Sequence, residues 1–214
     1  KDSNGKIWIA SGNGIHCFDP KYDAWVHYTE EDGLPSSYCW KVFEDSQKRI
    51  WVGTDHGISI YNPNVDKDPP IVNINPELNS SIIAPGGNAQ FVYGGIDKWK
   101  YTRKERLLYS HRFNGEKWST YTTDTVASRT DLSPGKHRFD VKVMDMNWNV
   151  SEPVSWSFSV LGHWYEEPIF LIVISILSLI IFFLICLAII HLYKIERSNT
   201  DLNIAVNRLN STNA

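Results

Sequence analysis

Two short acidic runs are the first places in this sequence where chemistry is conceivable. Glu30-Glu31-Asp32 and Glu44-Asp45 set carboxylates side by side, and paired carboxylates can act as general acid and general base in a cleft. Both runs also lie beside turn residues, where an aspartate accepts hydrogen bonds from its own backbone. The turn interpretation is favoured. The sequence therefore predicts no catalytic residue in this chain, and it leaves open whether the whole protein is an enzyme.

The seven histidines and three cysteines show no metal-ligand spacing, and no glycine-rich phosphate loop is present. We therefore expect no metal and no cofactor. Cys186 lies inside an apolar run. Cys17 and Cys39 fall in two different strand-like segments, and two alternatives remain for them. A pair of packed thiols is favoured, because Cys39 stands where a buried aliphatic side chain is usual; a disulfide is the other alternative.

Aromatic side chains point to a different chemistry, namely stacking on sugar rings. Tyr38 and Trp40 flank Cys39 next to the loop from Asp32 to Ser37, at positions that the repeat described below leaves variable. If this loop opens onto a ligand face, Asp32, Ser37, Tyr38 and Trp40 form a candidate carbohydrate site. Packing of the two rings on a neighbouring repeat is the alternative, and it is favoured.

An internal repeat organises the first third of the chain. Residues 6–11 (KIWIAS) align with residues 49–54 (RIWVGT) at an offset of 43, and the same offset pairs Asp2 with Asp45. A period of about 40–50 residues with several short strands is the length of one propeller blade. Residues 1–66 are therefore predicted to be C-terminal blades of a β-propeller whose other blades precede this chain. Strands are expected at 6–11, 15–18, 24–29, 38–44, 49–54 and 58–61.

Strict alternation of apolar and polar residues begins after a proline-containing linker at 66–70. Phe139, Val141 and Val143 alternate with charged residues, and the apolar side chains of 156–160 alternate with serines. A period of two indicates half-buried strands with one wet face. Residues 67–162 are therefore predicted to form an immunoglobulin-like β-sandwich, so the fold class is mainly β up to this point.

A membrane-spanning helix is predicted at 168–192. No charged residue occurs from Ile169 to Ile190, and more than about 18 successive apolar residues indicate a transmembrane helix. Basic residues follow the span and acidic residues precede it, so the N-terminal part is expected outside and the C-terminus in the cytoplasm. Residues at the two membrane interfaces are expected to anchor the helix: Trp164, Tyr165, Tyr193 and Lys194.

A heptad pattern marks residues 193–214 as the start of a coiled coil. One seven-residue series is Leu192, Asn199 and Val206, and the other is Ile195, Leu202 and Leu209. These are the a and d positions of a parallel coiled coil, in which an asparagine at a selects register and strand number. We therefore expect a homodimer with a cytoplasmic signalling helix. The alternative for Asn199 is a surface position on a plain helix.

Two segments carry a family resemblance. Residues 31–37 (EDGLPSS), 44–45 and 50–58 (IWVGTDHGI) resemble the two-component regulator propeller repeat. Residues 109–115 (YSHRFNG), Trp118 and 132–139 (LSPGKHRF) resemble the three-tyrosine (Y_Y_Y) domain that follows such propellers. His111 and His137 stand where that family usually has tyrosine, which puts the hydrogen bonds of those phenols in question. Residues after the span show no phosphoacceptor-histidine motif.

The resemblance implies the sensor part of a two-component receptor, of the hybrid histidine kinase kind common in Bacteroidetes. Such a receptor is a single-pass protein of the bacterial inner membrane with a periplasmic propeller and sandwich. The implied ligand is an oligosaccharide or another small periplasmic molecule. The alternative is a membrane-anchored glycan-binding or scaffold protein without kinase output. A net charge of −3 without a basic stripe excludes nucleic acid as a partner of this segment; the lipid bilayer and a second copy are the other partners expected.

Overall fold

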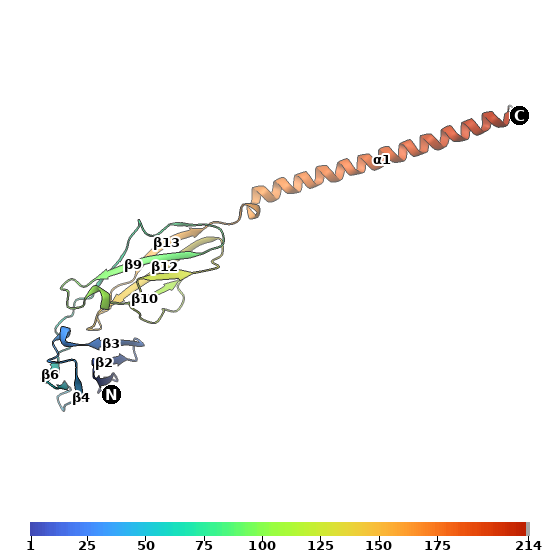
Figure 1. Ribbon diagram of the computed structural model, residues 1–214. Helices are drawn as coiled ribbons and strands as arrows, with labels where there is room; N and C mark the ends of the chain where they lie inside the picture. Colours follow the sequence, from blue (N-terminus) through green and yellow to red (C-terminus); the bar gives the residue numbers. More distant parts are fainter. Residues whose placement is uncertain (213–214) are drawn as a thin grey trace. The chain divides into compact units, whose positions relative to one another are not determined.

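A computed structural model describes the backbone of residues 1–212, and the side chains up to Ala205 together with that of Asn207. It consists of two compact units, Lys1–Leu161 and Gly162–Ala214 (Figure 1). The first unit is built of β-strands, and the second contains one long helix. Among the heptad positions, the side chains of Val206 and Leu209 lie outside the described residues.

Two three-stranded antiparallel sheets form the N-terminal part of the first unit. The first sheet contains β1 (Ile7–Ser11), β2 (Gly14–Asp19) and β3 (Ala24–Tyr28), and the second contains β4 (Cys39–Glu44), β5 (Ile50–Thr54) and β6 (Gly57–Tyr61). A short 3-10 helix, η1 (Glu30–Asp32), lies between the sheets in sequence. No strand bound differs from its expected position by more than one residue, so the six predicted strands are confirmed.

The two sheets share one core. Cys17, Val26 and Tyr28 of the first sheet are buried with Val52 of the second, and Met146 from the connection after β12 joins them. Cys17 and Cys39 are both buried free thiols, which confirms the favoured alternative, and burial raises the pKa of Cys17 to about 12. A thiol with so high a pKa is chemically inert and acts as a small apolar side chain.

The outer face of each sheet is apolar and exposed. Phe18 and Trp25 pack against each other on the first sheet, with ring centroids 5.0 Å apart. Phe43 and Trp51 do so on the second, with ring centroids 6.4 Å apart. Apolar faces on both sides of a small sheet are expected of blades that stack on further blades.

The alignment by 43 residues shows which strand the second sheet lacks. β5 and β6 correspond to β1 and β2, but no strand of the second sheet corresponds to β3. The aligned residues 67–70 include Pro69 and Pro70, which have no backbone N–H to donate to a ladder. The chain instead leaves for the next domain.

Residues after this linker form a two-sheet sandwich. Its strands are β7 (Ile71–Ile74), β8 (Ile82–Ile83), β9 (Ala89–Ile96), β10 (Leu108–Phe113), β11 (Val126–Arg129), β12 (Gly135–Met144) and β13 (Val154–Val160), with a 3-10 helix, η2 (Lys104–Arg106). One sheet has the order β10-β12-β13-β8 and the other β11-β9-β7. Phe91, Phe139 and Phe158 fill the space between them, and the Phe91 ring centroid lies 4.7 and 4.8 Å from the other two. The predicted alternation is confirmed for Ser157–Val160 in β13, and Phe139, Val141 and Val143 of β12 are buried as predicted. Asp140, predicted on the wet face, is instead fully buried, because Arg112 and Arg138 cover its carboxylate.

The second unit begins with a 3-10 helix, η3 (Trp164–Glu166), and continues as α1 (Pro168–Thr212), a helix of 45 residues. Its Pro168–Ala205 segment is long and apolar enough to cross a membrane. At about 1.5 Å per residue, α1 is roughly 68 Å long, about twice the thickness of a hydrocarbon core. Ser175 and Ser178 donate their hydroxyls to the carbonyls of Leu171 and Ile174 at 2.7 and 2.8 Å, so neither needs water.

Candidate ligand face and blade–sandwich junction

Tyr38 and Trp40 form an exposed aromatic pair at the start of β4. Their ring centroids are 5.2 Å apart in an edge-to-face arrangement, and the two residues are 51% and 67% exposed. The register of β4 against β5 shifts between Cys39 and Lys41. Such a bulge leaves one residue without a cross-strand partner and redirects its side chain, and that residue is Trp40. Both rings are therefore free to contact a ligand.

Ser37 holds the loop before this pair rather than presenting its hydroxyl. Its backbone N–H donates to Glu30 Oε1 at 2.7 Å, and its carbonyl accepts from the N–H of Gly14 at 2.6 Å. These bonds tie the loop to the first sheet at one end and to η1 at the other. Ser37 thus positions Tyr38 through the backbone.

Asp32 faces the sandwich. Its carboxylate accepts from the backbone N–H of Thr29 at 2.7 Å and from Arg106 Nη1 at 2.7 and 2.9 Å, and its side chain is only 14% exposed. Arg106 also donates to the carbonyl of His27. The structure therefore brings Tyr38 and Trp40 together, while Asp32 lies at the other end of the same loop.

The junction between blade and sandwich has further polar contacts. Arg103 Nη1 pairs with Glu31 at 3.0 Å, and the hydroxyl of Tyr28 donates to the carbonyl of Met146 at 2.8 Å. Asn149 Nδ2 reaches the carbonyl of Asp66 at 3.3 Å. Sequence reasoning missed the two arginines. In the sequence, Arg103 and Arg106 are visible only as part of a basic run around η2. Such a run does not predict which acidic residues the arginines contact.

A cleft of about 350 Å³ opens beside these contacts. Residues of both sheets and of the sandwich line it, including Trp8, Asp32, Tyr61, Tyr101 and Met146. Neither Tyr38 nor Trp40 lines this cleft. The described part of the chain has no group of three or more His, Cys, Asp or Glu side chains able to hold a metal ion.

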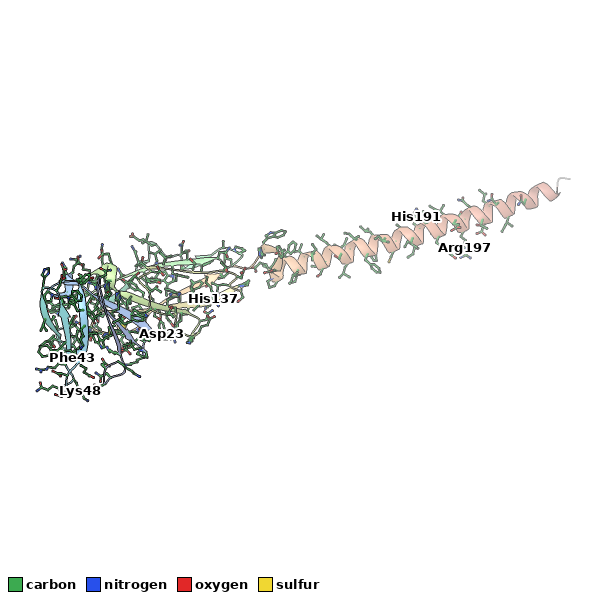
Figure 2. The ribbon with its side chains drawn as sticks, turned by 60° about the horizontal axis from the view of Figure 1, so that its bottom comes forward. Asp23, Phe43, Lys48, His137, His191 and Arg197 are labelled. Atoms are coloured by element: carbon green, nitrogen blue, oxygen red, sulfur yellow. The ribbon has the colours of Figure 1, made fainter. Side chains whose placement is uncertain are left out.

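The two histidines at tyrosine-like positions differ in their surroundings. His137 accepts from Asn114 Nδ2 at 2.9 Å and donates Nε2–H to the carbonyl of Ser133 at 2.7 Å (Figure 2). His111 is half-buried, and its Nδ1 lies 3.4 Å from the hydroxyl of Ser119. Burial lowers the pKa of His111. His137 therefore makes the kind of polar contact that a phenol would make there.

The predicted membrane anchors and heptad positions belong to the second unit. The Trp164 ring contacts Phe170 with centroids 4.7 Å apart, and Tyr165 stacks on His163 at 5.0 Å. Side chains project from α1 on all sides, among them His191 and Arg197 (Figure 2). The described side chains of the heptad series and the anchors after the span are exposed in the single chain: Leu192, Tyr193, Lys194, Ile195, Asn199 and Leu202.

The loop and the strands β4 and β5 match a known family. Residues 33–56 match the two component regulator propeller family. This regulator-propeller match begins in the loop after η1 and ends just before β6, so it contains Ser37, Tyr38, Trp40 and the Asp45 turn. The resemblance drawn from the sequence is confirmed for this repeat. The likeness of residues 67–162 to the three-tyrosine domain stays a prediction.

Solved structures similar to this chain include extracellular domains of hybrid two component systems. One is the extracellular domain of the hybrid two component system BT3049 from B. thetaiotaomicron, with 20% identity, a TM-score of 0.43, and coverage of 75% of this chain and 25% of that one. Another is that of BT4673 from the same organism, with 17% identity, a TM-score of 0.33, and coverage of 78% and 25%. The chain thus spans about a quarter of the length of these structures. The PKD1 domain of Vibrio anguillarum Epp is similar over 46% of this chain and 100% of its own, at 14% identity and a TM-score of 0.34. No curated protein matches the chain.

Proposed function

We propose that this chain is the extracytoplasmic sensor and transmembrane part of a two-component receptor of the hybrid histidine kinase kind. The observation that carries the proposal is the loop from Thr29 to Trp40. One end of the loop presents an exposed aromatic pair, and the other end is ion-paired to Arg106 of the sandwich. A ligand bound at the first end has a short, rigid connection to the domain that precedes the membrane helix in sequence.

The proposed ligand is an oligosaccharide. Trp and Tyr rings offer flat apolar faces to the C–H groups of a pyranose, and their polar tips remain hydrated. Tyr38 and Trp40 are both more than half exposed, and each lies in the residues that match the regulator propeller. Further blades would contribute the remaining contacts of the site.

Signal transfer requires that the ligand bind two receptor arrangements with different affinity. The proposed receptor is a homodimer of the bacterial inner membrane, with the β unit in the periplasm and the end of α1 in the cytoplasm. Continuity of α1 from Pro168 to Thr212 supports transfer along one rigid element. The a and d positions headed by Leu192 and Ile195 would form the dimer contact, with Asn199 fixing the register.

Replacement of Trp40 tests the ligand face. Xylohexaose, cellohexaose and maltohexaose are titrated into the full chain in nanodiscs, with binding followed by calorimetry. At least one should bind, and Trp40→Ala should weaken it by about tenfold or more, as for an aromatic hot spot. Trp25→Ala is the matched control, because Trp25 is 50% exposed on the other sheet. Equal losses in both variants, or loss of folding in Trp40→Ala, would favour packing on a neighbouring blade.

The output is tested separately by reading the gene downstream of the Ala214 codon. A phosphoacceptor-histidine helix followed by an ATP-binding domain is the expected result. A stop codon soon after would favour the alternative, a membrane-anchored glycan-binding or scaffold protein. This result does not depend on the oligosaccharide titration, so the two parts of the proposal fail independently.

A further inference from the structure

The outer face of the β10-β12-β13-β8 sheet carries a cluster of basic side chains. Arg112 of β10 and Arg138, Lys136 and Lys142 of β12 project from it, as alternate residues of paired strands do. We call these four residues the cationic face. Opposite them along β13, the alternate positions are serines: Ser155, Ser157 and Ser159.

One carboxylate, that of Asp140, lies among these cations, and it is ion-paired with two of them. Asp140 is 0% exposed and accepts from Arg112 at 2.9 Å, from Arg138 at 2.6 and 3.1 Å and from Ser155 at 2.7 Å. Burial raises its pKa, but the hydrogen bonds from Arg138, Ser155 and Arg112 outweigh burial and hold the pKa below its ordinary value. Four positive charges therefore face one negative charge, and the face keeps an excess of positive charge.

Three of the four basic side chains, those of Arg112, Arg138 and Lys142, are held in place before any ligand arrives. The Arg112 guanidinium lies 4.5 Å from the ring centroid of Trp118, and Lys142 Nζ lies 4.3 Å from the same ring. Asp140 restrains Arg112 and Arg138 from below. Because these side chains are already ordered, the protein loses less side-chain conformational entropy when a ligand binds to them.

An open hollow of about 950 Å³ lies on this face. It is lined by Arg112, Lys136 and Arg138 and by the hydroxyl-bearing Ser81, Ser157 and Ser159, and no carboxylate is among its lining residues. The Ser157 and Ser159 hydroxyls follow each other at about 7 Å along the strand. Guanidinium and ammonium groups bind carboxylates and sulfates strongly, and free hydroxyls bind the hydroxyls of a sugar.

A second copy of this face does not fit the hollow. A two-fold contact places the same surface opposite itself, so an isologous dimer here would bring like charges together. A lipid surface does not fit either, because an interfacial site needs exposed apolar side chains that enter the acyl region, and the large apolar side chain that lines the hollow, Phe158, is buried. An extended anion with many hydroxyls matches both the charge and the serines.

We propose that the cationic face of the sandwich binds an acidic polysaccharide segment, whose uronate or sulfate groups pair with Lys136 and Arg138. This site is distinct from Tyr38 and Trp40, which lie on the regulator-propeller repeat. It gives the sandwich a binding role of its own. The inference goes beyond the proposed function, because it holds whether or not the chain signals to a kinase.

The test uses the full chain in phosphatidylcholine nanodiscs and three hexasaccharides, namely oligogalacturonate, a heparin-derived hexasaccharide and neutral cellohexaose. At least one acidic hexasaccharide should bind, and its affinity should fall as NaCl is raised from 0.1 to 0.5 M, because salt screens the charges. The double variant Lys136→Gln/Arg138→Gln should bind about tenfold more weakly, since it removes two charge-assisted contacts. The two acidic probes distinguish carboxylate from sulfate recognition.

Two controls keep the result decisive. Lys136→Gln alone cannot disturb the fold through a lost contact, because the Lys136 side chain is exposed and has no hydrogen bond or ion pair within the described residues. It should weaken binding by about threefold. Lys67→Gln, in the exposed linker, should change nothing. Unchanged binding of the acidic hexasaccharides in the double variant, an equal loss of cellohexaose binding in that variant, or acidic binding that does not weaken with salt would each overturn the proposal.

Discussion

Trp51 donates its indole N–H to the carboxylate of Asp45 at 2.8 Å, and Trp8 donates to Asp2 at the same distance. In both cases the other carboxylate oxygen accepts backbone N–H groups two and four residues further along the chain. Hydrogen bonds from Trp51 and from Arg49 lower the pKa of Asp45 despite some burial. Both repeats therefore have an aspartate-to-tryptophan clasp, which closes the turn before β1 in the first sheet and before β5 in the second.

Breaking one clasp should destabilise the β unit measurably. Trp51→Phe removes the indole donor and should lower the free energy of unfolding by about 1 kcal/mol, the net value of one hydrogen bond. A double-mutant cycle with Asp45→Ala, followed by urea denaturation, should give a coupling of about 0.5–1.5 kcal/mol. Trp25→Phe is the control, because the Trp25 indole has no hydrogen-bond partner among the described residues. A coupling of zero would show that the clasp contributes nothing.

Two glycines at equivalent repeat positions should respond differently to alanine. Gly14 and Gly57 both have positive φ, +105° and +142°. A Cβ at Gly14 would overlap the carbonyl oxygen of Tyr28 in β3, whereas at Gly57 the nearest atom is Pro35 Cβ at 3.7 Å. Gly57→Ala should cost about 1–3 kcal/mol from backbone strain alone, and Gly14→Ala should cost clearly more. Urea denaturation measures both losses of unfolding free energy. Equal losses would contradict the structure, in which β2 pairs with β3 but β6 has no such neighbouring strand within residues 1–212.

The ion pairs of the junction should differ in their contribution to stability. Arg106 and Asp32 are 23% and 14% exposed, whereas Arg103 and Glu31 are 63% and 52% exposed. Arg106→Ala removes the ion-pair partner of Asp32 and the donor to the His27 carbonyl, and it should cost about 1–3 kcal/mol. Arg103→Ala should cost under about 1 kcal/mol, as exposed pairs do. Limited proteolysis of the linker around residues 66–70 should accelerate only in Arg106→Ala.

Asp145 should make stability depend on pH. It is fully buried in the connection after β12, and burial raises its pKa from 3.8 to about 6. The folded state therefore holds this proton more tightly than the unfolded state does. Its contribution to stability is complete below about pH 4 and is lost as the pH rises through about 6.

Comparison with Asp145→Asn isolates this contribution, because other carboxyls such as Asp140 shift in the opposite direction. The difference in unfolding free energy, wild type minus variant, should fall by on the order of 1–2 kcal/mol between pH 4 and pH 7. Urea denaturation at several pH values measures it. A difference that is constant with pH would show that Asp145 titrates normally.

Cross-linking tests the dimer along α1. Single cysteines at Ile195 and Leu202, in a Cys186→Ala background, should form disulfides in the membrane, because d positions of a parallel coiled coil face each other. Leu209 continues this series in the sequence. Glu196→Cys and Asn203→Cys are the matched controls one residue further along. Uniform cross-linking at all positions would contradict the dimer.

Local patterns in the sequence were sufficient for the strands, the sandwich and the helix. Alternation over Phe139–Val143 and the offset of 43 between Trp8 and Trp51 depend on residues close in sequence or repeated in it. Backbone geometry converts these periods directly into buried and exposed faces. The charge-free run to Ile190 likewise predicts a helix that can span a membrane, since both its length and its apolarity can be read directly from consecutive residues.

Tertiary structure alone decided what the loop residues do. Asp32 is a plausible sugar ligand by type, yet its partner is Arg106, which lies 74 residues away in the sequence. The same holds for Asp140 with Arg112, which lies on the neighbouring strand β10. Pairs of this kind form because burial removes water from a charge and only an opposite charge or donor replaces it. Which opposite charge does so depends on how distant strands meet, and no local pattern contains that information.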